Sequence, residues 1–478
     1  MNLDQLFSIL DADAARAVAP LITVTVGVIL LLLVETIPGL LSLRPVAFVG
    51  ALVAGAWSEL QLLAVPAGVV LDGTFESSKA TAGWGLVFLA SAAIAWGFGR
   101  RYYRANRSFI GEHDILMLTS VVGMMLMAGS RDLLVFFVGL ELLSIPLYCL
   151  AGFRRARNDS VEAGLKYFVL GAFASAIYLF GASLVYLSQG TLGLGALEEA
   201  GITSPVGLAG LGLVLASLFF KISAVPFHLW TPDVYQGAPT PVTAFMATGT
   251  KAAGFAFLLQ FAPLLPTSAV PALAVLAFLT MAVGNLGALV QGDLKRMLAY
   301  SGIAHAGTLL VAVVGGMAGD PLEGATSAAI FYMAAYVFTA GGAFGLISWL
   351  EADGEHFTQL SSIRGLAQRR PAIAAAMTLF LLSLGGIPAT GGFLGKWFVF
   401  SVAVRADLVP LAILGILLSV VALGYYLRVI VAMYMEPAPE GQAPPMTPRM
   451  SAGIAAIACA AMVVLLGVLP GVVLPHLP

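Results

Sequence analysis

Five side chains that can carry a charge lie inside long apolar stretches of the sequence. The acid is Glu141, within "LLVFFVGLELLSIPLYCL", and the bases are Lys221, Lys251 and Lys396. His305 is the fifth, within "MLAYSGIAHAGTLLVAV". A charge near the centre of a membrane helix costs about 2.5–3.5 kcal/mol on insertion scales, so such residues need a reason to be there.

Together these groups could move protons. Burial disfavours the charged form of a lysine, while a nearby carboxylate favours it. A lysine held between the two tendencies can gain and lose a proton near neutrality, and a change at its carboxylate partner would move that proton. The set therefore predicts a proton relay with an electrostatic switch.

Each member also has a purely structural interpretation. Glu141 could hold helices together by pairing with a neighbouring lysine. A lysine near a helix end can extend its ammonium group to the membrane surface, which suits Lys396 better than Lys251, whose position is central. His305 is explained equally well as a hydrogen-bonded core histidine.

The composition around these residues is typical of an integral membrane protein. The chain has 478 residues, of which 60% are hydrophobic and only 10% charged, against about 25% charged in an ordinary globular domain. The net charge of −2 gives no basic balance for binding nucleic acid. Cys149 and Cys459 lie in apolar stretches, which argues against a disulfide framework and against a cysteine-based metal site.

Fourteen stretches are long enough to span a bilayer, which takes ~20 mostly apolar residues. They are 20–38, 46–70, 82–99, 113–129, 131–152, 162–188, 206–233, 240–263, 268–290, 297–318, 323–350, 372–405, 409–433 and 450–474. The stretch 46–70 is the weakest, because Glu59 and Gln61 interrupt it. The first stretch is expected to be a retained helix rather than a cleaved leader, since no basic start precedes it.

The basic residues favour one orientation. With the loop "GRRYYRANRSFIGEHD" in the cytoplasm, alternation also places the basic clusters around Arg154, Lys295 and Arg369 inside. The opposite side receives acidic residues such as Glu198 and Glu323. This is the bias that short loops of membrane proteins show, and it predicts that both termini lie outside.

Two of the stretches, 206–233 and 372–405, are long for one helix. Pro226 follows Lys221 within two turns, and "GGIPATGG" precedes Lys396. Broken backbone inside a membrane is tolerated only where it is buried in protein or lines a wet cavity. Paired breaks in the two halves of a chain are typical of an inverted-repeat transporter site.

Several long motifs resemble a known family. "FFKISAVPFHLWTPDVYQGAPTPVTAFMATGTK" is similar to the signature of the antiporter-like subunits of respiratory complex I and its relatives. "LKRMLAYSGIAHAG" and "GGIPATGGFLGKWFVF" are further matches, in the same order along the chain. The resemblance covers roughly residues 110–430, and the wording after the Pro-Asp step is most similar to one subtype of these subunits.

The resemblance implies an all-α polytopic fold of about 14 transmembrane helices, with discontinuous helices 7 and 12. Two inverted five-helix repeats would occupy residues 111–265 and 266–435. Helices 1–3 would lie in residues 1–110, and a linker with helix 14 in 436–478.

The resemblance also assigns a role to each residue. Glu141 would be the carboxylate partner of Lys221, Lys251 the central lysine, and Lys396 the group that faces the outward exit, while His305 matches more loosely. The implied activity is proton translocation by a membrane-arm subunit of a bacterial inner-membrane NADH-quinone oxidoreductase, coupled to quinone reduction elsewhere. Other membrane-arm subunits and the lipid bilayer would be its partners.

No redox centre is expected in this chain. The sequence has no Walker loop, GxGxxG or CxxC pattern, and no stretch between the spans is long enough for a soluble domain. The resemblance places NADH, FMN, the iron–sulfur clusters and the quinone in partner subunits, and predicts no metal site.

Three alternatives remain open. The chain could belong to a multisubunit cation/proton antiporter or a membrane-bound hydrogenase, which would keep the lysines but lack NADH and quinone partners. It could be a structural scaffold that does not conduct. A stand-alone solute transporter is the weakest alternative, because nothing resembles a pocket for an organic substrate.

Overall fold

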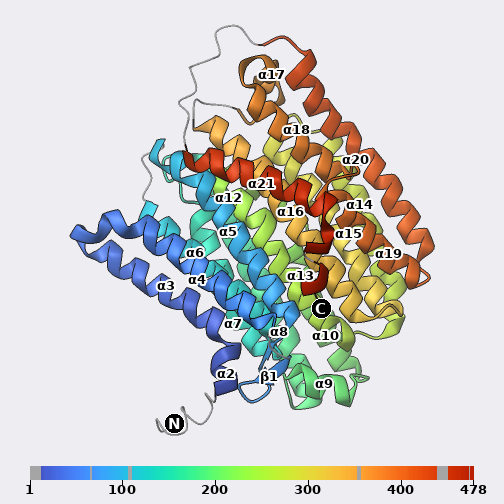
Figure 1. Cartoon of the computed structure of the whole chain (residues 1–478). Coiled ribbons are helices and arrows are strands. Elements are labelled where there is room, and N and C mark those ends of the chain that lie inside the picture. The colour runs from blue at the N-terminus through green and yellow to red at the C-terminus, as the bar shows by residue number, and fades with distance from the viewer. Residues whose placement is uncertain are drawn as a thin grey trace.

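The computed structural model describes residues 12–64, 67–105, 110–352, 357–438, 450–472 and 474–477. In this part of the chain, helices account for nearly all regular structure, and they run side by side as a bundle (Figure 1). The all-α membrane fold predicted from the sequence is confirmed.

Among the first described elements, the long helices α3 (Ala19–Thr36) and α4 (Arg44–Leu62) stand at one edge of the bundle (Figure 1). The short α2 (Ala12–Ala17) leads into α3, and η1 (Pro38–Leu43) turns the chain into α4. Only about a quarter of the residues in α3 and α4 are buried inside the molecule, so both helices present apolar faces outward.

The weakest predicted span, 46–70, is shorter than expected. Its helix ends at Leu62, and the last residues form β1 (Gly68–Val70), which pairs antiparallel with β2 (Phe75–Ser77). The prediction ran too far because an apolar run continues through this hairpin, and an apolar run of that length does not by itself distinguish helix from strand.

The remaining elements follow in a regular succession of long helices. They are α5 (Lys79–Ala105), α6 (Ile110–Gly129), α7 (Leu133–Ala151), α8 (Asn158–Gln189), α9 (Leu194–Ala200), α10 (Pro205–Ile222), α11 (Trp230–Gly237), α12 (Thr240–Phe245), the π-helical η2 (Met246–Thr250), α13 (Lys251–Phe261), η3 (Ala262–Leu264), η4 (Thr267–Ala269), α14 (Val270–Leu289), α15 (Leu294–Ala318), α16 (Leu322–Glu351), η5 (Leu360–Ile363), α17 (Leu366–Arg369), α18 (Pro371–Gly385), α19 (Gly391–Arg405), α20 (Val409–Met435), α21 (Met450–Val468), η6 (Pro470–Val472) and η7 (Leu474–His476).

Twelve helical segments in the described part of the chain are long and apolar enough to cross a membrane. Of the fourteen predicted spans, the two outside this set are α6 and the broken pair α18 and α19. Every predicted span thus has a helix or a broken helix as its counterpart. The segments that contain α13, α15 and α16 are almost fully enclosed by other helices, and they form the centre of the bundle.

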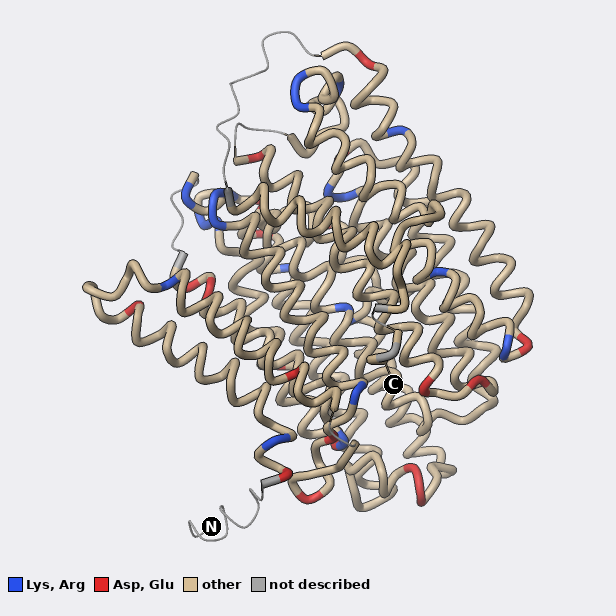
Figure 2. Tube along the Cα trace, viewed as in Figure 1, with Lys and Arg blue, Asp and Glu red and all other residues tan. Residues whose placement is uncertain are grey.

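Charged residues collect at the two ends of the bundle. Figure 2 shows few charges along the middle of the helices, more basic residues at the upper end and more acidic residues at the lower end. This distribution agrees with the bias from which the orientation was predicted.

The two predicted breaks are confirmed, and both follow the same local design. After α10, Ser223 adopts the left-handed conformation (φ 64°), and Pro226 follows. After α18, Gly386 is left-handed (φ 87°), and Pro388 follows. A left-handed residue satisfies the last carbonyls of a helix, and a proline soon after it prevents the helix from continuing.

Candidate functional site

The first group of the site lies between α7, α8 and the end of α10. The Lys221 ammonium group is 4% exposed and donates to the Ser144 hydroxyl at 2.7 Å and to the Tyr167 hydroxyl at 3.3 Å. The Glu141 carboxylate accepts a hydrogen bond from Ser175 at 2.5 Å. Glu141 and Ser144 are three residues apart on α7, so they lie on the same helix face.

No direct ion pair joins Glu141 and Lys221 among the described residues. The lysine donates to Ser144 and the carboxylate accepts from Ser175, so the two charges lie near the same face of α7 with separate hydroxyl partners. The Ser144 hydroxyl itself donates to the carbonyl of Leu140, which leaves its oxygen free to accept from the lysine.

Stacked aromatic rings lead from this group toward the centre of the bundle. The Tyr167 ring lies 5.6 Å from the Lys221 nitrogen and stacks on Trp230 with the ring centroids 4.7 Å apart. Trp230 meets Tyr235 edge to face at 6.0 Å, and the Tyr235 ring lies 5.8 Å from the Lys251 nitrogen. Both lysines thus lie near the faces of aromatic rings, which attract cations.

Lys251 lies at the start of α13, directly after the π-helical turn η2. Its side chain is 1% exposed, and its nitrogen has no hydrogen-bond partner among the described residues. An isolated ammonium group is costly to hold in such surroundings. Single π-helical turns occur frequently at functional sites, and this one offsets the helix just before the buried lysine.

Gly302 of α15 makes room for the Lys251 ammonium group. A Cβ atom at Gly302 would lie 2.7 Å from the Lys251 nitrogen and 3.1 Å from the Tyr336 hydroxyl. The glycine therefore lets the lysine and the tyrosine face the same point on α15. This contact joins the lysine of the first half of the chain to a hydroxyl of the second half.

His305 lies between two tyrosine hydroxyls in the second half. Its Nδ1 atom is 2.5 Å from the Tyr332 hydroxyl, and its Nε2 atom is 3.3 Å from the Tyr426 hydroxyl. The His305 ring also contacts the ring of Tyr336 with centroids 5.0 Å apart. A neutral imidazole has one donor and one acceptor nitrogen, so His305 can pass a proton from one hydroxyl to the other.

Lys396 is bound to the broken end of the preceding half-helix. Its nitrogen donates to the carbonyls of Leu384 at 2.9 Å and Gly385 at 3.0 Å, at the C-terminus of α18. Lys221 likewise lies in the last turn of α10. The C-terminal end of a helix carries partial negative charge, so each break supplies a favourable place for a lysine cation.

A small cavity lies between His305 and the break that holds Lys396. Its volume is about 10 Å³, and its lining includes the side chains of Tyr332, Tyr336 and Ser383 together with Leu384. That volume corresponds to about one water molecule, and several polar groups line it. A single bridging water could connect the histidine to the carbonyl that accepts from Lys396.

The structure thus brings all five predicted residues into one row that crosses both halves of the chain. Sequence reasoning missed the hydroxyl groups between them, which are Ser144, Tyr167, Ser175, Tyr235, Tyr332, Tyr336 and Tyr426. A signal was present for most of the tyrosines, because tyrosines of membrane proteins concentrate at the interfaces, whereas Tyr167, Tyr332, Tyr336 and Tyr426 lie within predicted spans and Tyr235 lies between two of them. In the described residues, no cluster of His, Cys, Asp or Glu side chains could hold a metal ion.

The chain matches one family of known proteins, and its relatives carry the same name. Residues 130–422 match the family described as NADH:quinone oxidoreductase/Mrp antiporter, TM. A relative from Trichlorobacter lovleyi, NADH-quinone oxidoreductase subunit N, is 45% identical over 74% of both chains. The subunit N of Myxococcus xanthus is 41% identical over 95% of this chain and 94% of its own length.

Solved structures show the same likeness. A chain of respiratory complex I from Thermus thermophilus superposes with a TM-score of 0.82 and 38% sequence identity, covering 95% of this chain and 98% of that one. A chain of the Mrp complex from Dietzia has a TM-score of 0.80 at 21% identity, which is a likeness of fold alone.

Proposed function

Because this chain belongs to the family of NADH:quinone oxidoreductase and Mrp antiporter membrane subunits, we propose that it is a proton-translocating membrane-arm subunit of a bacterial complex I. Its relatives named subunit N support this assignment. The enzyme of which it is a part is a proton-translocating NADH:quinone oxidoreductase. NADH, FMN, iron–sulfur clusters and quinone would bind in partner subunits.

The row of buried ionisable groups is the observation that carries the proposal. Protons would pass from the cytoplasm through Lys221 and Lys251 to His305 and Lys396, and then outward. Glu141 would control Lys221 through the electric field of its charge, since Ser144, which accepts from the lysine, lies one helical turn from Glu141 on α7. Quinone reduction in the partner subunits would drive the switch.

The proposal includes an internal repeat and an orientation. Residues 111–265 and 266–435 would form the two inverted repeats, each with a broken helix. The chain would lie in the inner membrane with both termini on the periplasmic side. Neighbouring complex I subunits and lipid would cover the outward-facing apolar surfaces.

The experiment is proton pumping by the assembled complex in membrane vesicles, with Lys251→Met compared with the parent protein. Methionine keeps the approximate length of the side chain and removes the proton-carrying group. We expect redox-driven pumping to fall strongly while assembly is intact. A control is Lys79→Met, which changes a lysine at the outer end of α5, away from the row.

Two alternatives predict different outcomes. A non-conducting scaffold would pump equally well with Lys251→Met, and that result would exclude the proposed relay. A subunit of a cation/proton antiporter would lose ion exchange in the variant, but it would purify without NADH-oxidising and quinone-reducing partners. The composition of the purified complex therefore separates the antiporter from complex I.

A further inference from the structure

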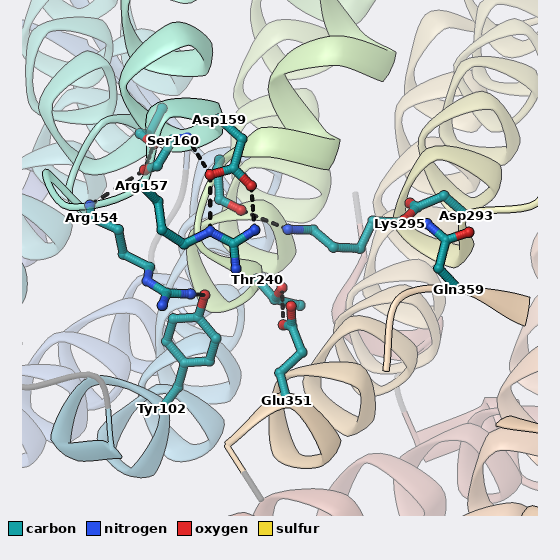
Figure 3. Close-up of polar contacts among 12 residues, drawn as sticks. Tyr102, Arg154, Arg157, Asp159, Ser160, Thr240, Asp293, Lys295, Glu351 and Gln359 are labelled. Atoms are coloured by element: carbon teal, nitrogen blue, oxygen red, sulfur yellow. Dashed lines mark hydrogen bonds and ion pairs between the residues drawn. The ribbon is translucent and has the colours of Figure 1, made fainter. Parts of the chain in front are cut away.

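A polar cavity of about 210 Å³ lies apart from the row of relay groups, where the ends of several helices meet. Figure 3 shows its side chains converging from α5, α8, α15 and α16 and from the loop before α8. The charged or phenolic side chains in its lining are Tyr102, Arg154, Arg157, Asp159, Asp293, Lys295 and Glu351. The cavity lies at the end of the bundle that carries the basic loops.

The cavity leads from the surface to buried charge. At its rim, the side chains of Arg157 and Asp159 form an ion pair and are 48% and 44% exposed. At its floor, Lys295 is 3% exposed and Tyr102 is 2% exposed. A buried ammonium group that can be reached from an exposed ion pair is a feature of an entry path, because it attracts water and small ions into the protein.

Two carboxylates in this cavity, Asp293 and Glu351, have no ion-pair partner among the described residues. Asp159 is paired with Arg157, and Asp293 caps the start of α15 and accepts from Gln359. Glu351 instead accepts from the Thr240 hydroxyl, and no cation among the described residues lies within ion-pair distance of it. Its oxygens can therefore take up a proton without first breaking an ion pair.

Glu351 and Lys295 each connect to a helix that reaches Lys251 or its surroundings. Thr240, the partner of Glu351, is the first residue of α12, which continues through η2 into α13 and so into Lys251. Lys295 is seven residues before Gly302 on α15, so the two lie on the same face about 10 Å apart along the axis. Gly302 is the residue against which the Lys251 nitrogen packs.

We propose that this cavity is a cytoplasmic entry that loads Lys251 in addition to the route through Lys221, with Glu351 as the carboxylate that collects protons. Glu351 would take a proton from a hydronium ion at the cavity mouth, forming one O–H bond as one is broken. The O–H bond on Glu351 would break again as an N–H bond forms on the neutral amine of Lys251, which lies further along the helical run that begins at Thr240, and Glu351 would return to its ionised form. The inference rests on the proposed function, because it assumes that Lys251 carries protons.

The test compares Glu351→Gln with Glu323→Gln in vesicles that contain the assembled complex. The control glutamate lies in the first turn of the same helix, α16, at its opposite end. Without the collecting carboxylate, uptake depends directly on the hydronium concentration. We expect Glu351→Gln to lower pumping several-fold at alkaline pH and to approach the parent protein as the pH falls, while Glu323→Gln follows the parent throughout.

The pH profile separates proton collection from a structural role, which would lower pumping equally at every pH. The charged groups that face Glu351 are unchanged in the variant, and they are Arg154, Arg157, Asp159, Asp293 and Lys295, with the phenol of Tyr102. A Glu351→Gln profile parallel to that of the parent overturns the inference.

Two further variants complete the test. If Glu351→Gln does not assemble, Glu351→Met carries the test, since it also removes the carboxylate and keeps the approximate length of the side chain. It should then lower pumping at alkaline pH only, and an unchanged profile overturns the inference. Lys251→Met serves as the reference. Normal pumping by Lys251→Met contradicts the proposed function, whereas loss in Lys251→Met with a parental profile in Glu351→Gln contradicts only the entry path.

Discussion

At the scale of single residues, the lysines of this protein differ in how their ammonium groups are supported. Lys221 has two hydroxyl acceptors, Lys396 has two backbone carbonyls, and Lys251 has no acceptor among the described residues. A proton therefore meets favourable sites on either side of a central site that binds it less well. Such an arrangement favours the transfer of a proton through Lys251 over its retention there.

Ser144 accepts a hydrogen bond from Lys221 on the helix face that carries Glu141, and its removal is a specific test. A hydrogen bond to a charged group contributes about 1.5–3 kcal/mol. We expect Ser144→Ala to lower proton pumping, but by less than Lys221→Met, because the Tyr167 hydroxyl remains. Ser183→Ala on α8 is the control, since that hydroxyl is exposed and bonds only its own helix. Pumping by Ser144→Ala equal to that of Ser183→Ala would show that the hydroxyl carries no coupling.

The sequence predicted the ionisable residues but not the hydroxyls between them. A glutamate or lysine inside an apolar span is conspicuous because of its cost. A serine or tyrosine in the same place is inexpensive, and its role depends on which residue faces it from another helix. Ser144 and Lys221 are 77 residues apart in the chain, so their contact depends on the packing of α7 and α10 against α8.

At the scale of the elements, several helix pairs are packed closely, among them α8 and α10 through Gly181 and Gly210. Cβ atoms added at Gly123 or Gly139 would meet the backbone of the other helix in the pair α6 and α7. Cβ atoms at Gly284 and Gly307 would do the same in the pair α14 and α15. Small residues permit this approach, and close packing is a main source of helix association in membranes. The same design thus occurs in both halves of the chain.

A matched pair of glycine substitutions tests this packing. A Cβ at Gly139 would lie 2.9 Å from the backbone nitrogen of Met127, whereas one at Gly212 would have no atom within 4 Å. Both positions are inside helices, so alanine improves helix propensity equally at each. Gly139→Ala should destabilise by about 1–3 kcal/mol, the usual cost of overpacking, and Gly212→Ala should not. The measurement is the temperature at which the detergent-solubilised complex loses this subunit. Equal temperatures for the two variants would contradict the close packing.

The breaks were predictable from the sequence, while the π-helical turn was not. Proline and glycine within a span that is too long for one helix predict a break in that helix. The turn η2 lies in "MATGT", which contains no breaker other than one glycine. It results from fitting α12 and α13 into a fully enclosed place, which is a property of the whole bundle.

At the scale of the whole molecule, the relay connects the two halves of the chain at a single contact. Lys251 meets Gly302 and Tyr336 at the centre of the bundle, where α13, α15 and α16 are enclosed by other helices. The entry cavity also draws its charged groups from both halves. A shift of one half against the other would therefore change the entry and the central contact together, which gives the fold a means of coupling them.

The direction of proton flow depends on orientation, which a labelling experiment can determine. Glu199 lies on the predicted outer side between α8 and α10, and Arg155 on the predicted inner side between α7 and α8; both are exposed. Each would be replaced by cysteine in a chain whose Cys149 and Cys459 are changed to serine. A membrane-impermeant maleimide should label Glu199→Cys but not Arg155→Cys in intact spheroplasts.

Inverted vesicles supply the control, because they should reverse the labelling of the same two variants. The expected orientation follows from the excess of basic residues on one side of the bundle, and Arg155 belongs to one of those basic clusters. Labelling of Arg155→Cys from outside the spheroplasts would contradict that orientation. The cavity around Glu351 would then lie on the outer side, and it would have to serve as an exit rather than an entry.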